Sequence, residues 1–138
     1  MGEAEVHLQG NNICFTITNK EFQRGPEKMT YQGYLVSEKA KIVWGYSIKS
    51  TIFKEGDCYS YGILPAGAEV NNADEGEKLP EKAPPLQVNT LYSVSVHAGT
   101  NIPTDPTHGY HTYFCLHRGN DSIAVQQGYS LKESSCSK

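Results

Sequence analysis

The sequence lacks the features that would place the chain inside a membrane or on nucleic acid. No apolar run approaches the roughly 18 residues needed to span a bilayer. Lys and Arg number 12 against 15 Asp and Glu, so the net charge is -3, and no basic surface is expected to attract phosphates or anionic lipids. We therefore expect no nucleic acid partner, and membrane contact only through a lipid anchor outside this sequence.

The start of the chain also lacks a targeting signal. Residues 1–10 have neither the basic start nor the apolar stretch of a signal peptide. Two interpretations follow: either the protein is cytosolic, or Met1 stands where a targeting segment was removed. The cysteines favour the second interpretation, an exported protein.

Cysteine is scarce, and its spacing excludes common intracellular cysteine sites. The four cysteines form no CxxC pair, so zinc-finger and thioredoxin spacings are absent. An even number in a small β-rich chain favours disulfides, and hence a periplasmic or otherwise exported protein. Alternation along the strands favours a pairing of Cys14 with Cys115 and of Cys58 with Cys136. All three pairings nevertheless remain open at this point.

Helical periodicity is absent too, because no i, i+3, i+4 apolar pattern is sustained. The clearest pattern is an alternation in residues 41–65, and it predicts a β-hairpin. A turn signal at Glu55-Gly56-Asp57 separates its two extended runs, and the second run ends at Pro65. One face of the first run is apolar, which predicts that the only tryptophan is buried in the core. That face carries Ile42, Trp44, Tyr46 and Ile48.

Other short alternating runs bring the expected total to about eight strands. Outside the hairpin they cover residues 6–8, 13–18, 31–37, 91–98, 110–117 and 123–125. Gly33 is expected to form a bulge in one of them. The pattern predicts one all-β domain over residues 1–138, an antiparallel, immunoglobulin-like β-sandwich of seven to eight strands.

Two long polar connections and a polar tail interrupt this pattern. Residues 66–85 are acidic and rich in proline, which predicts a mobile loop. Residues 99–109 form a second long turn, and residues 127–138 form the tail. As docking residues on these connections we expect four acids that speed association with a basic partner, and two apolar or aromatic anchors. The acids are Asp74, Glu75, Glu77 and Glu81; the anchors are Ile102 and Tyr110.

Histidines, cysteines and serines are the candidate catalytic or metal-binding groups. His111 and His117 lie on one strand but about 20 Å apart by strand rise, so no metal site is expected from these and the neighbouring histidines. Ser60 lies in half of a nucleophile elbow with no helix after it. Cys115 shares a face with His117, but a half-cystine is the commoner role in an exported β domain. We expect no catalytic residues and no cofactor. Asn120-Asp121-Ser122 is a glycosylation sequon, relevant only in a eukaryotic source.

The order of the strand cores resembles that of a known family. The segments that carry the likeness are Ile13-Cys14-Phe15, Val43-Trp44, Asp57-Cys58-Tyr59, Tyr61-Gly62, Leu91-Tyr92-Ser93-Val94 and Tyr113-Phe114-Cys115-Leu116. They are similar to segments of small enterobacterial periplasmic lipoproteins that act as immunity proteins against type VI secretion effectors. The chain departs from that family in lacking the signal peptide and the lipidated cysteine. The resemblance implies an exported, non-enzymatic protein that neutralises a toxin by occluding it.

Two further function classes were considered. One is a carbohydrate- or ligand-binding module of a secreted or cell-surface protein, in which exposed tyrosines such as Tyr59, Tyr61 and Tyr110 form a stacking platform. The other is a small hydrolase that uses Ser60 or Cys115, and it ranks last.

Overall fold

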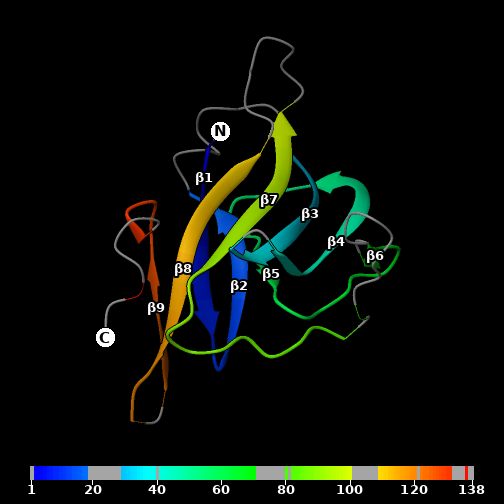
Figure 1. Ribbon diagram of the computed structural model, residues 1–138. Coiled ribbons are helices and arrows are strands. Elements are labelled where there is room, and N and C mark those ends of the chain that lie inside the picture. Colours follow the sequence, from blue (N-terminus) through cyan, green and yellow to red (C-terminus); the bar gives the residue numbers. More distant parts are fainter. Residues whose placement is uncertain are drawn as a thin grey trace.

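The computed structural model describes residues 2–18, 29–39, 41–70, 80, 82–100, 109–120, 122–131 and 136. Its regular structure is almost entirely β-strand, so the all-β prediction is confirmed (Figure 1). No helix among these residues is long and apolar enough to cross a membrane. The strands are β1 Gly2–Gln9, β2 Asn12–Ile17, β3 Met29–Glu38, β4 Lys41–Ile52, β5 Tyr59–Ser60, β6 Glu69–Val70, β7 Tyr92–Thr100, β8 Tyr110–Arg118 and β9 Ile123–Gln127.

All nine strands belong to one hydrogen-bonded sheet, in the order β5-β2-β1-β8-β7-β3-β4-β6, with β9 paired to β8 off this path. Most neighbours are antiparallel, but β1 runs parallel to β8, pairing Gly2 with Tyr110 and Glu3 with His111. The expectation of a wholly antiparallel sheet is therefore wrong. One edge of β1 pairs with the antiparallel strand β2. At its other edge lies β8, which runs in the same direction as β1.

The predicted hairpin over residues 41–65 is wrong in its pairing. The first strand, β4, pairs with the preceding strand β3 through a tight turn at Lys39, whose φ is 57°. The run after Gly56 pairs instead with β2, where Tyr59 lies opposite Phe15. The turn itself is present, since the Asp57 backbone N–H donates to the Lys54 carbonyl at 2.9 Å. A disulfide between Cys14 and Cys58 joins this run to β2.

Gly33 forms the predicted bulge in β3. The register of β3 against both β4 and β7 shifts between Tyr31 and Gly33. The φ of Gly33 is 118°, and a Cβ at this position would lie 2.1 Å from the Tyr46 carbonyl oxygen. Only glycine accommodates that conformation and that close approach.

The core forms because the sheet curls and brings its two ends together. Phe15 of β2 packs edge-on against Tyr34 of β3, with ring centroids 4.8 Å apart, and also contacts Phe114 of β8. At the far end, Tyr59 stacks on Tyr31 with centroids 3.6 Å apart. These contacts place β2 and β5 across the inner face of β3 and β8.

The tyrosines of this core have partners for their hydroxyl groups. The hydroxyls of Tyr31 and Tyr46 lie 2.6 Å apart, and Tyr34 donates to the Ser60 carbonyl at 2.9 Å. Burial raises the pKa of all three, that of Tyr46 to about 12. The aromatic core is therefore uncharged at neutral pH.

Trp44 is fully buried, as its strand pattern predicted. Its indole contacts the rings of Tyr34, Tyr46 and Tyr61. The Nε1–H donates to the Pro80 carbonyl at 3.0 Å, so the connection after β6 is tied to the core.

The connection over residues 66–85 is held to the fold near both ends. Inside it, β6 pairs with β4, matching Val70 with Tyr46. At its far end the Pro84 carbonyl accepts a hydrogen bond of 2.6 Å from the Tyr61 hydroxyl. Residues 71–79 and 81, which carry the four predicted docking acids, lie outside the described residues.

Candidate binding face

The strands β7 and β8 lie side by side and divide their residues between two faces (Figure 1). Toward the core they direct buried side chains that are apolar or aromatic, apart from Thr112. The buried residues of β7 are Tyr92, Val94, Val96 and Ala98. Half-buried side chains on the opposite side of the two strands form part of an outer surface. They are Ser93, Ser95, His97, His111 and Tyr113.

Cross-strand pairing arranges these side chains in rows with the neighbouring residues of β3. Ser95 lies opposite Leu35 on one side and His111 on the other. Ser93 in the same way lies between Ser37 and Tyr113. Directly opposite residues on one face of a sheet contact one another, so the rows form a continuous surface. We call this surface the serine-aromatic face: Leu35, Ser37, Ser93, Ser95, His97, His111, Tyr113 and Tyr129.

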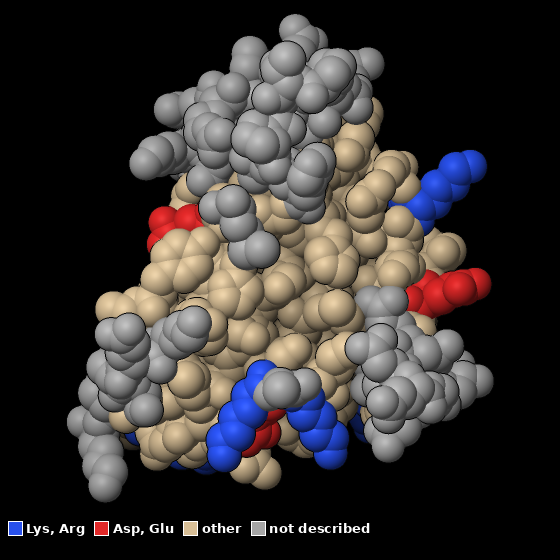
Figure 2. All heavy atoms as spheres, turned by 45° about the horizontal axis from the view of Figure 1, so that its top comes forward, with Lys and Arg blue, Asp and Glu red and all other residues tan. Residues whose placement is uncertain are grey.

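This face has no Asp, Glu, Lys or Arg side chain in its middle. Within β3, β7, β8 and β9 the only such residues are Glu38 and Arg118, and each is the last residue of its strand. On the neighbouring strand β1, the exposed Glu3 lies at the border of the face, opposite His111. Figure 2 shows one view of the molecule in which charged side chains lie around the margin and the middle is uncharged. Contact in this region would therefore require little desolvation of charge.

An aromatic cluster occupies one side of the face. The rings of His111 and Tyr113 meet edge-on with centroids 4.8 Å apart, and Tyr129 stacks on His111 at 6.1 Å. The Tyr129 hydroxyl donates to the Gly2 carbonyl at 2.8 Å, and the Gly128 N–H donates to the Tyr113 carbonyl at 2.9 Å. With 46% of its surface exposed, Tyr129 presents a fixed ring to solvent.

The segment after β9 holds Tyr129 in this position. Leu131 is buried, and a disulfide joins Cys136 to Cys115 on the outer side of β8. The favoured pairing of Cys14 with Cys115 is therefore wrong, because β1 lies between β2 and β8 in the sheet. With the bond between Cys14 and Cys58, all four cysteines are oxidised, which indicates an oxidising, exported compartment.

His97 is the second histidine on the face. Burial lowers the pKa of its imidazole, since a low-dielectric surrounding disfavours the charged form. The ring is therefore neutral at neutral pH.

The predicted docking and platform residues that the structure describes do not lie on this face. Ile102, like the four acids, lies outside the described residues. Tyr110 is only 2% exposed, and its hydroxyl donates to the Met29 Sδ at 3.7 Å. Its expected exposure is wrong because alternation along β8 turns it inward with Phe114. Tyr59 and Tyr61 are half-buried and pack against the core instead of forming a platform.

Sequence reasoning missed the aromatic cluster although part of its signal was present. The alternation of β8 placed His111 and Tyr113 on the face opposite Phe114. Tyr129 carried no such signal, because its position depends on the turn after β9 and on the disulfide to Cys136.

The candidate catalytic residues Cys115 and Ser60 have structural partners. Cys115 is a half-cystine, so the proposal of a thiol nucleophile there is wrong. Ser60 lies in β5, where it pairs with Cys14 of β2, and its Oγ donates to Gln9 Oε1 at 3.2 Å. Within the described ranges, no three His, Cys, Asp or Glu side chains converge as a metal site would require.

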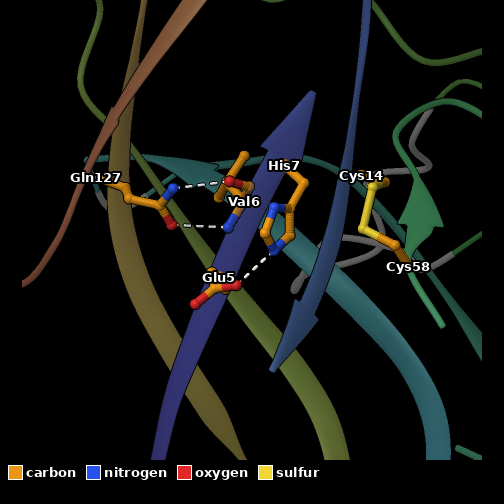
Figure 3. Close-up of polar contacts among 6 residues, drawn as sticks. All are labelled: Glu5, Val6, His7, Cys14, Cys58 and Gln127. Carbon is orange, nitrogen blue, oxygen red and sulfur yellow. Dashed lines mark hydrogen bonds and ion pairs between the residues drawn. A yellow bond between two sulfur atoms is a disulfide. The ribbon is translucent and has the colours of Figure 1, made fainter. Parts of the chain in front are cut away.

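A separate polar contact lies on the exposed side of β1. Glu5 and His7 form a close pair on this strand, near the disulfide between Cys14 and Cys58 (Figure 3). Both side chains are well exposed, and exposed pairs contribute little to stability.

Comparisons with protein-family models, with curated proteins and with solved structures give no match to this chain. The function must therefore be argued from the faces and hollows of the molecule.

Proposed function

We propose that the chain is an exported binding domain that docks a protein partner through the serine-aromatic face. The observation that carries this proposal is the uncharged, tyrosine- and serine-bearing surface built on two long strands. The buried cores of protein interfaces are depleted in charge and enriched in tyrosine. Tyrosine and serine together supply contact area and hydrogen bonds at a low entropic cost.

The placement of the face on strands supports tight recognition. Tyr113 and His111 lie on β8, which pairs with β7 on one side and with β1 and β9 on the other. Groups held by such a scaffold need little ordering when they bind.

Within this class we favour an immunity protein that neutralises a toxin by occluding it. The resemblance of the strand cores to periplasmic immunity lipoproteins points to this assignment, and the oxidised cysteines fit the compartment. In this proposal the two ends of the curled sheet face each other as the two sheets of an immunoglobulin-like sandwich do. The acids Asp74, Glu75, Glu77 and Glu81 would speed the approach of a basic toxin without supplying the affinity.

The test is binding kinetics against the product of the gene beside this one, with a charge placed inside the face. Ser95 lies in the middle of the face and is half-buried, so Ser95→Arg should raise the dissociation rate at least about tenfold. Ser50→Arg is the matched control, because Ser50 is exposed near the end of β4, two strands away from β7. Equal dissociation rates for the parent and both variants would remove the serine-aromatic face from the interface.

A carbohydrate-binding module is the second candidate, favoured by one observation. Tyr129 presents an exposed ring next to serine hydroxyls, an arrangement on which a sugar ring can stack and form hydrogen bonds. Titration with soluble cell-wall and plant oligosaccharides would distinguish it. Saturable binding that Tyr129→Ala abolishes would favour this class over the protein partner.

A further inference from the structure

The sheet forks where β1 and β9 separate. β8 pairs with β1 only at its start, through Tyr110 and His111, whereas its second half pairs with β9 from Phe114 to Arg118. No backbone ladder joins β1 to β9 among the strands that the structure describes. At the open end of this fork, Asn11 of the β1–β2 turn and Arg118, Gly119, Asn120 and Ser122 of the β8–β9 connection line one hollow.

A single glutamine closes the inner end of the fork. The Gln127 side chain accepts a hydrogen bond from the Val6 N–H at 2.8 Å and donates one to the Val6 carbonyl at 2.7 Å (Figure 3). Its amide thus occupies this edge of β1 as the peptide group of a neighbouring strand would. The contact shows that this edge of β1 can accept a peptide-like partner.

Two adjoining hollows of about 300 and 290 Å³ lie at the open end of the fork. Asn11 and Ile123 line both of them, so the hollows adjoin each other. The first is polar and is lined by Arg118, Asn120 and Ser122. The second is largely apolar, and its walls include Ile13, Tyr61, Pro84, Pro85, Leu86 and Leu116.

The walls of both hollows are fixed by hydrogen bonds. The Tyr61 hydroxyl donates to the Pro84 carbonyl at 2.6 Å, and the Tyr61 N–H donates to the Ile13 carbonyl at 2.9 Å. Across the β8–β9 turn, the Gly119 N–H donates to the Ser122 carbonyl at 2.7 Å. A preformed site of this kind loses little entropy when a ligand enters.

Among the residues that the structure describes, Arg118 is the only charged one that lines either hollow. Within the described part of the chain it makes no ion pair, although the protein as a whole is acidic. A guanidinium in this position is complementary to a carboxylate, which it can bind through two parallel hydrogen bonds.

We propose that the fork binds the C-terminal end of an extended peptide. The last apolar side chain of the peptide occupies the hollow beside Pro84 and Leu86, and its free carboxylate binds Arg118. The amides of Asn11 and Asn120 supply donors and acceptors for the peptide backbone, which an acyl chain would leave unused. This site lies apart from the serine-aromatic face and does not depend on the function proposed for it.

The test uses N-acetylated tripeptides that end in Leu, Phe or Val, each with a free carboxylate and as the C-terminal amide. Titration at millimolar concentration, followed by ¹H–¹⁵N NMR, should shift the amide resonances of Asn11, Leu86 and Arg118. The acid should bind about tenfold more tightly than the amide, because only the acid forms a charge-assisted pair.

Arg118→Gln should remove the difference between acid and amide and leave the apolar contact. Lys41→Gln is the matched control, because Lys41 is an exposed cation that lines neither hollow, and it should preserve the difference. The proposal is overturned if no tripeptide acid shifts these resonances, or if acid and amide bind the parent equally. Neither result bears on Ser95→Arg, so the two proposals fail separately.

Discussion

The two disulfides should contribute unequally to stability. Cys14 and Cys58 are separated by 44 positions in the chain, and Cys115 and Cys136 by 21. In the chain-entropy model, the stabilisation grows with the logarithm of the loop that the bond closes in the unfolded chain. That relation yields about 4.0 kcal/mol for the first bond and about 3.3 kcal/mol for the second at 25 °C.

The surroundings of the two bonds widen the difference. The first bond joins β2 to the run that places Tyr59 and Tyr61 against the core, so its loss also loosens aromatic packing. The second bond fastens the segment after β9 to the outer side of β8. Its loss should release Tyr129 from His111 while the core remains intact.

The assay compares the double variant Cys14→Ala/Cys58→Ala with Cys115→Ala/Cys136→Ala in urea denaturation followed by circular dichroism. The first should lose more free energy of unfolding, and the second should show the larger change in the ring resonances of Tyr129. If the second variant lost more stability, or if Tyr129 were unchanged in it, the role assigned to the segment after β9 would be refuted.

Two further predictions concern Trp44 and His97. Trp44→Ala should lower the free energy of unfolding by about 3–5 kcal/mol, because the buried indole and its bond to Pro80 are both lost; in the parent, a fluorescence maximum typical of water-exposed indole would contradict the burial. Burial lowers the pKa of His97 below its ordinary value of 6.5, so below pH 6.5 the unfolded chain binds more protons and stability falls as the pH falls. Denaturation between pH 7 and 5 should therefore show a shallower fall for His97→Gln than for the parent or the control His7→Gln, and equal slopes would contradict it.

Local alternation predicted most of the strands correctly because it acts over a few residues. The inner face of β7, the bulge at Gly33 and the burial of Trp44 all follow from side-chain periodicity or from the backbone freedom of glycine. The hairpin β8–β9 follows from the turn residues between its strands. Each of these features is decided by neighbours along the chain.

The pairing between strands was harder to predict from the sequence, as the region over residues 41–65 demonstrates. The turn at Gly56 looks like a hairpin turn, and β4 ends just before it. A two-residue turn at Lys39 offers β4 a nearer partner in β3, and the two strands pair over eight residue positions. The run after Gly56 was therefore free to pair elsewhere, and the bond to Cys14 joins it to β2. A local turn signal does not show which of its two flanking strands β4 will pair with.

The aromatic cluster of the candidate face depends on the same kind of long-range information. His111 and Tyr113 could be assigned to one face of β8 from alternation alone, but whether that face was covered or open could not. The answer lies in the segment after β9, which covers Cys115 by a disulfide and sets Tyr129 beside His111. The alternation along a strand shows which residues share a face. Whether that face is exposed depends on which other segments of the chain pack over it. A search for binding surfaces in such domains should therefore begin with the order of the strands and the anchoring of the tail, and only then turn to the tyrosines.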